Sequence, residues 1–224
     1  MSTQLSNWLN QSGLSIESLS SEMPHSVLSP LTDYSVIRVS GQDAEKFMQG
    51  QFSCDVREVG LQQSRMGTAN TPKGRAYGVF RIAKQGDDYL IRLPSSIADD
   101  FCQRLNKYIV FSKATLTLDE DLCVLGFSGD PASLANLMQT TTELPSTVDS
   151  STQLAECVVI SVPSDQTKRF EIWGSIHNTT AFLSATQSSN DLKVGVGSQS
   201  FWNWEEVNQG IAEIYPATQE SYIP

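Results

Sequence analysis

SRMGTANTPKGRAYGVFRIAKQGDDYLIRLP, residues 64–94, is the stretch that decides the fold of this chain. It holds three segments rich in β-forming side chains, with Tyr77 and Phe80 in the middle one. The segments are separated by PKG at 72–74 and by QGDD at 85–88, and each turn contains a glycine that can adopt positive φ. The pattern therefore predicts three consecutive antiparallel strands joined by tight turns.

The segments on both sides add helices and further strands. Residues 95–108 carry apolar side chains at helical spacing, and residues 114–118 alternate apolar side chains with threonines, which is typical of a strand. Upstream, the sequence predicts a strand at 35–41 and a short helix at 43–51.

A second series begins after the acidic turn at 119–121. Strand, helix, strand, strand, helix and strand follow one another across residues 122–197, which is the order of a ferredoxin-like half. The polar stretch 139–153 is expected to be a loop inside it. The predicted fold class is therefore α+β with mostly antiparallel sheets.

Four segments are predicted along the chain. They are a helical N-terminal arm at 1–24, a first α+β subdomain at 25–120, a ferredoxin-like subdomain at 121–199, and a returning segment at 200–224 that packs on the first subdomain.

Composition narrows the class of protein. Of the 224 residues, 39% are hydrophobic and 18% are charged, which excludes collagen-like chains and strongly charged disordered chains. No apolar run approaches the ~20 residues that a membrane helix needs. The first residues, MSTQLSNWLNQSG, lack the basic and apolar regions of a secretion signal, so we expect a cytoplasmic protein.

The net charge of −10 is unevenly distributed. Residues 1–115 hold 12 of the 15 basic side chains and 11 acidic ones, whereas residues 116–224 hold 3 basic and 14 acidic side chains. The first half is therefore able to bind an anion although the whole chain is acidic.

Motifs of common catalytic and metal sites are absent from the sequence. The four cysteines form no CxxC pair and the only histidines are His25 and His177, so neither a metal site nor a Ser-His-Asp arrangement is expected. No Gly-rich phosphate-binding motif and no GxSxG occurs either. No catalytic residue is assigned.

Seven Lys and Arg side chains concentrate between residues 57 and 92, interleaved with aromatic residues. One hypothesis is an anion-binding face, with Lys73 and Arg75 at the tip of a tight turn. The other, which the composition favours, is the solvated face of a hairpin, because alternate strand residues point outward.

A second cluster joins Phe201, Trp202 and Trp204 to Glu205 and Glu206. Indole rings can stack on a planar heterocycle, and a carboxylate can accept hydrogen bonds from the N–H groups of that heterocycle. The alternative, which the residues alone favour, is that Trp202 packs a helix on the core while the glutamates face water.

Four stretches carry a family resemblance, in the order GQDAEKFMQGQFSCDV (41–56), NTPKGRAYGVFRI (70–82), LNKYIVFSKATLTL (105–118) and EEVNQGIAEIYPATQESYIP (205–224). Together they resemble the YgfZ-type folate-binding proteins, which are relatives of the glycine-cleavage aminomethyltransferase. The succession of MQGQ, PKGR and KYIVFSK favours the YgfZ branch over the aminomethyltransferase itself.

The resemblance implies an aminomethyltransferase-like fold with a central pocket for tetrahydrofolate. It also implies a role in maintaining iron–sulfur enzymes, including one that modifies tRNA by methylthiolation. By position in the family pattern, Tyr34 and Trp202 would stack on the pteridine, with Tyr34 in place of a tryptophan. Lys73 and Arg75 would meet the anionic glutamate tail.

Two departures from the family pattern matter. Asn208 stands where the family has a glutamate that pairs with the pterin N–H groups, so lower folate affinity is expected unless Glu205 or Glu206 substitutes. The family's Lys-Gly-Cys-Tyr-Thr-Gly-Gln-Glu run would follow Pro224. We therefore expect a shortened relative without the family's key cysteine and without its C-terminal β-barrel.

Three functions are compatible with these features. The first is a non-catalytic tetrahydrofolate-binding protein that supports iron–sulfur enzymes and thereby tRNA modification. The second is an aminomethyltransferase that passes a one-carbon unit to tetrahydrofolate, against which Asn208 counts. The third is a nucleic-acid binding module that uses the basic hairpin; because the acidic second half would repel phosphates, no direct nucleic-acid partner is expected.

Overall fold

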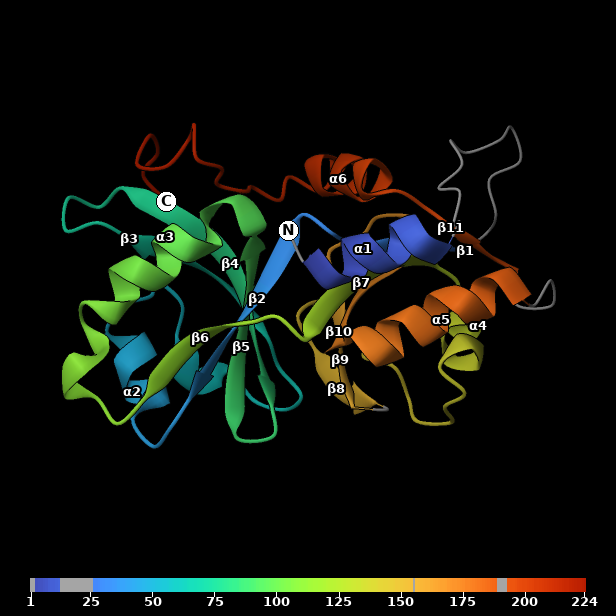
Figure 1. Ribbon diagram of the computed structural model, residues 1–224, viewed down its shortest axis with the longest axis horizontal. Helices are drawn as coiled ribbons and strands as arrows, with labels where there is room; N and C mark the ends of the chain where they lie inside the picture. Colours follow the sequence, from blue (N-terminus) through green and yellow to red (C-terminus); the bar gives the residue numbers. More distant parts are fainter. Residues whose placement is uncertain (1–2, 13–25, 155, 189–192) are drawn as a thin grey trace. The chain divides into compact units, whose positions relative to one another are not determined.

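The chain divides into two compact units (Figure 1). Unit 1 contains Asp33–Glu120 and Ala212–Pro224, and unit 2 contains the described residues of Ser2–Thr32 together with Asp121–Ile211. Each unit has one sheet and a hydrophobic core of its own. The computed structural model describes residues 3–12, 26–154, 156–188 and 193–224.

Unit 1 is built on a five-stranded antiparallel sheet in the order β3-β4-β5-β2-β6. The three strands predicted within residues 64–94 are confirmed as β3, β4 and β5. Their first turn is closed by a 2.8 Å hydrogen bond from the Thr71 N–H to the Arg75 carbonyl, and Gly74 in this turn has φ 71°. The elements are β2 (Tyr34–Ser40), η1 (Val56–Glu58), β3 (Arg65–Asn70), β4 (Ala76–Gln85), β5 (Asp88–Pro94), η2 (Ile109–Phe111) and β6 (Thr115–Asp119).

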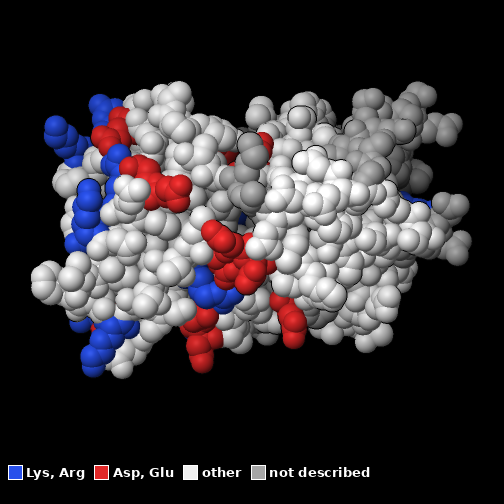
Figure 2. All heavy atoms as spheres, in the orientation of Figure 1, with Lys and Arg blue, Asp and Glu red and all other residues white. Residues whose placement is uncertain are grey.

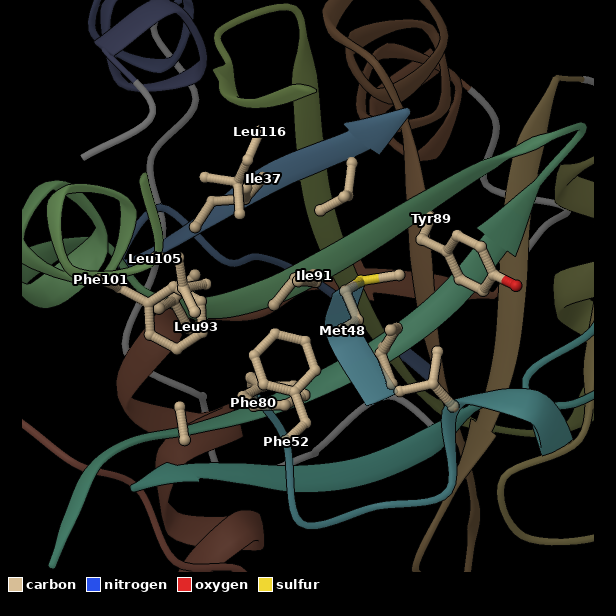
Figure 3. Close-up of a cluster of buried hydrophobic side chains, with 14 of the residues drawn as sticks. Ile37, Met48, Phe52, Phe80, Tyr89, Ile91, Leu93, Phe101, Leu105 and Leu116 are labelled. Atoms are coloured by element: carbon tan, nitrogen blue, oxygen red, sulfur yellow. The ribbon is translucent and has the colours of Figure 1, made fainter. Parts of the chain in front are cut away.

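Helices α2 (Ala44–Gln49) and α3 (Ser95–Asn106) contribute their apolar side chains to the core of unit 1 (Figure 3). The helical spacing predicted for α3 is confirmed, because Ile97, Phe101 and Leu105 are all buried. Burial of these side chains against the sheet is the main force that holds α3 in place.

The opposite face of this sheet carries two arginines. Strand side chains alternate between faces, so Arg81 and Arg92, which are directly paired across β4 and β5, point away from the core side chain Ile91. Both arginines are only 1% exposed. Arg81 and Arg92 therefore belong neither to a solvated hairpin face nor to an exposed anion-binding face, whereas Lys73 and Arg75 are exposed on the turn between β3 and β4.

Unit 2 is built on a six-stranded sheet in the order β11-β1-β7-β10-β9-β8. β1 pairs in parallel with β11 and antiparallel with β7, and the other pairs are antiparallel. The strands are β1 (Ser26–Pro30), β7 (Leu122–Gly129), β8 (Ser151–Leu154), β9 (Cys157–Val162), β10 (Lys168–Ser175) and β11 (Val194–Val196).

The ferredoxin-like order predicted for residues 122–197 is incomplete. β8 adds an edge strand beside β9, and β1 from the N-terminal part lies between β11 and β7. The polar sequence of β8 is typical of a loop, and only pairing with β9 makes it a strand. The prolines around β1 are also typical of a loop. Both strands that pair with β1 lie far along the chain, so no local sequence pattern predicts this strand.

Helices cover both faces of the unit 2 sheet. α1 (Thr3–Ser12), α4 (Pro131–Leu137) and α5 (Ile176–Ser188) share a core with the sheet residues Phe127 and Phe170. α6 (Gln199–Asn208) packs its buried side chains on the opposite face, next to Ser128 and Arg169. Of the predicted N-terminal arm, α1 is helical and residues 13–25 lie outside the described residues.

Across the described ranges, none of the helices combines the length and apolar character that crossing a membrane requires.

Candidate functional site

The buried side of α6 carries a tryptophan and two carboxylates. Ser198 caps the N-terminus of the helix, and its hydroxyl oxygen accepts a 3.1 Å hydrogen bond from the Phe201 N–H. Trp202, Glu205 and Glu206 lie three and four positions apart and therefore share one face of the helix. Their exposed fractions are 0%, 9% and 4%. Trp202 packs on the core as predicted, whereas the prediction that the glutamates face water is wrong.

Arg169 of β10 lies between these two carboxylates. Its Nη2 donates to Glu206 Oε1 at 2.5 Å, and its Nε lies 3.3 Å from Glu205 Oε2. The guanidinium carbon is 4.1 Å from the centre of the Trp202 ring, so that face of the indole is already covered. Ser128, which is paired with Arg169 across β7 and β10, donates to Glu205 Oε1 at 2.8 Å.

The cluster has more hydrogen-bonding capacity than the protein uses, both as acceptor and as donor. Glu205 Oε2, Glu206 Oε2 and Trp202 Nε1 are buried and have no hydrogen-bond partner among the described residues. Burial raises the pKa of Glu205, and the Ser128 hydrogen bond and the Arg169 charge oppose that shift. Buried polar atoms without hydrogen bonds are costly, so a ligand whose donors reach the two carboxylate oxygens would be stabilised here.

A cavity of about 520 Å³ opens beside the cluster within unit 2. Glu205 and Arg169 form part of its wall, and Asn208 from the last turn of α6 also lines it. Phe201 and Trp204 supply an aromatic wall, with ring centres 6.4 Å apart and planes inclined by 24°. The cavity therefore offers a carboxylate, a guanidinium, an amide and exposed aromatic surface to one ligand, which suits a planar polar heterocycle.

Gly126 of β7 makes room for Trp202. A Cβ atom at this position would lie 2.3 Å from Cε3 of the indole, which is far inside van der Waals contact. We expect Gly126→Ala to lower the free energy of unfolding by about 1–3 kcal/mol, because Trp202 is fully buried and its ring has nowhere to move.

Urea unfolding followed by far-UV circular dichroism checks the Gly126 prediction. Gly60→Ala is the matched control, since a Cβ at Gly60 meets nothing within 4 Å, and its effect is expected to stay within about 0.5 kcal/mol. Equal stability of the two variants would show that the indole does not need this space.

The five predicted folate-contacting residues divide between the units. Trp202 and Asn208 belong to α6 of unit 2, where Asn208 lines the cavity and Trp202 lies beneath Arg169. Tyr34, Lys73 and Arg75 belong to unit 1. No single unit brings all five together.

Within unit 1, Tyr34 forms part of a second buried cluster. The guanidinium carbon of Arg92 lies 4.2 Å from the centre of its ring, and its hydroxyl donates to Glu213 at 3.2 Å. Arg92 and Glu213 form an ion pair of 2.6 Å. Lys73 and Arg75 stand on the exposed β3–β4 turn, where Arg75 Nη1 donates to the Ser221 carbonyl.

Arg169 and Ser128 are the site residues that sequence reasoning missed. Arg169 stands in a segment, RFEIWGS, that is otherwise typical of a buried strand, and an arginine in such a strand is a signal for a buried partner. Its carboxylate partners are on α6, which follows about thirty residues later in the chain. Nothing in the sequence of α6 indicates that its glutamates pair with Arg169.

Within the part of the chain that the structure describes, no three His, Cys, Asp or Glu side chains lie together in a way that could hold a metal ion. Burial raises the pKa of Cys102 and of Cys157 to about 11, and it also raises the pKa of Cys54. These three thiols are therefore less reactive than an exposed cysteine.

Comparisons with known proteins give two kinds of likeness. No protein-family model matches the sequence. The chain is 26% identical over 203 residues to the tRNA-modifying protein YgfZ of Colwellia psychrerythraea, covering 91% of this chain and 60% of that one. It is 34% identical over 121 residues to the tRNA-modifying protein YgfZ of Escherichia coli strain K12, covering 53% of this chain and 36% of that one.

Among solved structures, the glycine cleavage system aminomethyltransferase T of Bartonella henselae is similar with a TM-score of 0.71 and 16% identity, over 84% of this chain and 52% of that chain. A heterotetrameric sarcosine oxidase of Corynebacterium gives a TM-score of 0.52 with 11% identity. The aminomethyltransferase-like α+β fold and the resemblance to YgfZ proteins are confirmed. The chain spans 60% or less of the length of the two YgfZ relatives described here.

Proposed function

We propose that this chain binds tetrahydrofolate in the unit 2 cavity and acts in tRNA modification by supporting iron–sulfur enzymes. The name of its relatives, tRNA-modifying protein YgfZ, supports the process, and the likeness to an aminomethyltransferase supports a fold suited to a folate. Tetrahydrofolate supplies one-carbon chemistry at its reduced ring. The alternative of an aminomethyltransferase rests on the likeness of fold alone, so binding without catalysis is the proposal.

One observation carries the proposal: Glu205, whose buried Oε2 makes no hydrogen bond with a described residue, lines the cavity, and Glu206 Oε2 is a second such oxygen on the same face of α6. The pteridine ring presents an exocyclic amino group and a ring N–H side by side, and a carboxylate accepts from such a pair. Asn208 lines the same cavity with a neutral amide. Glu205 therefore takes the part of the glutamate that Asn208 replaces.

The aromatic residues have separate tasks in this proposal. Trp204 is 63% exposed and lines the cavity with Phe201, so these two rings offer the surface on which the pteridine lies. Trp202 instead positions Arg169, because the guanidinium lies on its ring. The parts of Tyr34, Lys73 and Arg75 in folate binding remain predictions.

Isothermal titration calorimetry with 5-formyltetrahydrofolate tests this function. Glu205→Gln is expected to weaken binding about tenfold, because one charged acceptor is lost. Asn208→Glu is expected to strengthen binding about tenfold, because it adds a carboxylate to the cavity wall. A wild-type chain that releases no heat of binding, or Glu205→Gln binding as tightly as wild type, would contradict the proposal.

Val207→Glu is the matched control. Val207 lies on the same helix as Asn208, is 74% exposed and does not line the cavity. The substitution adds the same charge at the neighbouring position, so unchanged affinity shows that the gain from Asn208→Glu comes from contact and not from net charge.

A further inference from the structure

A second cavity, of about 540 Å³, lies within unit 1 and is distinct from the site on α6. Its wall comes from the chain after α2, from the β3–β4 turn, and from the C-terminal part of α3. None of the residues that line this cavity has a part in the proposed folate function.

Two polar atoms in its wall have no partner. Asn70 Oδ1 is buried and makes no hydrogen bond within the described residues, while Asn70 Nδ2 donates to Thr68 at 3.1 Å. Tyr77, which is 6% exposed, also lines the cavity, and its hydroxyl has no hydrogen bond to any described residue. Burial raises the pKa of Tyr77 to about 12, so the hydroxyl stays neutral and able to donate. The wall is thus built to receive a ligand that both donates and accepts.

The residues that line the cavity carry charges of both signs, with two basic side chains, Arg104 and Lys107, and one acidic side chain. Residues 59–86 and 101–118 contain no acidic side chain and eight basic ones, and both stretches contribute to the wall. Asp100 is the acidic residue of the wall; it accepts a 2.7 Å hydrogen bond from Arg104, which also forms a 2.7 Å ion pair with Glu220. Lys107 lines the cavity and makes no ion pair in the described part of the chain, and the same holds for Lys73 on the adjacent turn. Figure 2 shows Lys and Arg side chains on this side of unit 1, with Asp and Glu side chains among them.

Aromatic and apolar side chains continue outward from the rim. Tyr108 lines the cavity and is 55% exposed, and Val110 and Phe111 on η2 are 71% and 98% exposed. Large side chains exposed in succession and flanked by Lys107 and Lys113 are uncommon on a protein surface unless they meet a partner. Exposed rings beside unpaired lysines are the combination that holds single-stranded nucleic acids, because bases stack on the rings while phosphates meet the cations.

We propose that unit 1 binds a single-stranded nucleic acid at this cavity. One nucleotide enters it, with its base on Tyr108 and its base edge on the unpartnered groups of Asn70 and Tyr77. The adjoining phosphates meet Lys107 and Lys73, and a neighbouring base lies on Phe111. The acidic excess that argues against a nucleic acid lies mainly in unit 2, since unit 1 holds 12 basic and 13 acidic side chains.

Fluorescence anisotropy of the full chain with a labelled single-stranded eight-nucleotide RNA at low salt tests this proposal. Tyr108→Ala is expected to weaken binding about tenfold through lost stacking. Lys107→Gln is expected to weaken binding several-fold and to reduce the slope of log affinity against log salt by about 0.7. Both side chains are exposed, so neither change disturbs the core. Lys84→Gln is the matched control: it removes the same charge from unit 1 outside this cavity and is expected to leave affinity unchanged.

Three results would overturn the proposal. They are no binding at low salt, equal affinity of wild type and both cavity variants, or tighter binding of a poly-glutamate peptide than of the RNA, which would identify an acidic-protein site instead. The folate titration separates this proposal from the previous one, because Glu205→Gln is expected to leave RNA affinity unchanged and Tyr108→Ala to leave folate affinity unchanged.

Discussion

Arg169→Met is expected to lower the free energy of unfolding by roughly 3–5 kcal/mol. Arg169 is 2% exposed and is the cation that faces both Glu205 and Glu206. Methionine fills similar volume but leaves two carboxylates buried without a counter-charge, and the cost of burying an unpaired charge exceeds the modest value of the intact pair.

Urea unfolding followed by tryptophan fluorescence measures the Arg169 effect. All four tryptophans of the chain, Trp8, Trp173, Trp202 and Trp204, belong to unit 2, so the signal reports the unit that holds the cluster. Adding Glu206→Gln to Arg169→Met is expected to restore part of the lost stability, because one buried charge is removed. A loss below about 1 kcal/mol, or no recovery in the double variant, would show that the carboxylates are neutral or hydrated without Arg169.

Phe101→Ala is expected to destabilise unit 1 by roughly 3–5 kcal/mol. The ring is fully buried and lies among three others, with centre-to-centre distances of 5.7 Å to Phe80, 5.8 Å to Tyr77 and 6.1 Å to Phe52 (Figure 3). Removing it opens a cavity that the rigid sheet beneath α3 cannot close, so the transfer free energy of the ring and the cavity term are both lost.

Phe111→Ala provides the matched control for Phe101. Phe111 is 98% exposed, and its truncation is expected to change stability by less than about 0.5 kcal/mol. Urea unfolding followed by far-UV circular dichroism compares the two variants. Similar losses in both would mean that η2 contributes to the core, and a small loss in Phe101→Ala would mean that the neighbouring rings collapse into its space.

The local sequence pattern and the turn residues were sufficient to predict most of the strands and helices of unit 1. Alternating β-forming residues, with Gly74 at φ 71° and Gly86 at φ 57° in the turns, account for β3, β4 and β5. The apolar spacing of residues 95–108 accounts for α3. These elements depend on neighbours within a few residues, and such interactions can be recognised along the chain.

Pairing between strands that are far apart in the sequence could not be predicted from such local patterns. β1 lies between β7 and β11 although the prolines at positions 24 and 30 are typical of a loop, and β8 is a strand only because β9 lies beside it. A polar or proline-flanked segment becomes a strand when a partner satisfies its backbone groups, and the partner's identity is a property of the whole fold.

For the candidate site, too, the sequence predicted one part and the tertiary structure decided the other. The sequence by itself determined that an aromatic and acidic cluster stands at 201–206, and the role of Asn208 in place of a carboxylate is implied only by the resemblance to YgfZ proteins. Only the tertiary structure decided that Glu205 and Glu206 are buried around Arg169, and that Arg81 and Arg92 leave the surface. A charged side chain is stable inside a protein only when another element brings its counter-charge to it. In unit 2 this element is α6, which packs on the sheet, and in unit 1 it is the segment that places Glu213 beside Arg92. Both contacts join residues that are far apart in the sequence, so no short stretch of sequence encodes them.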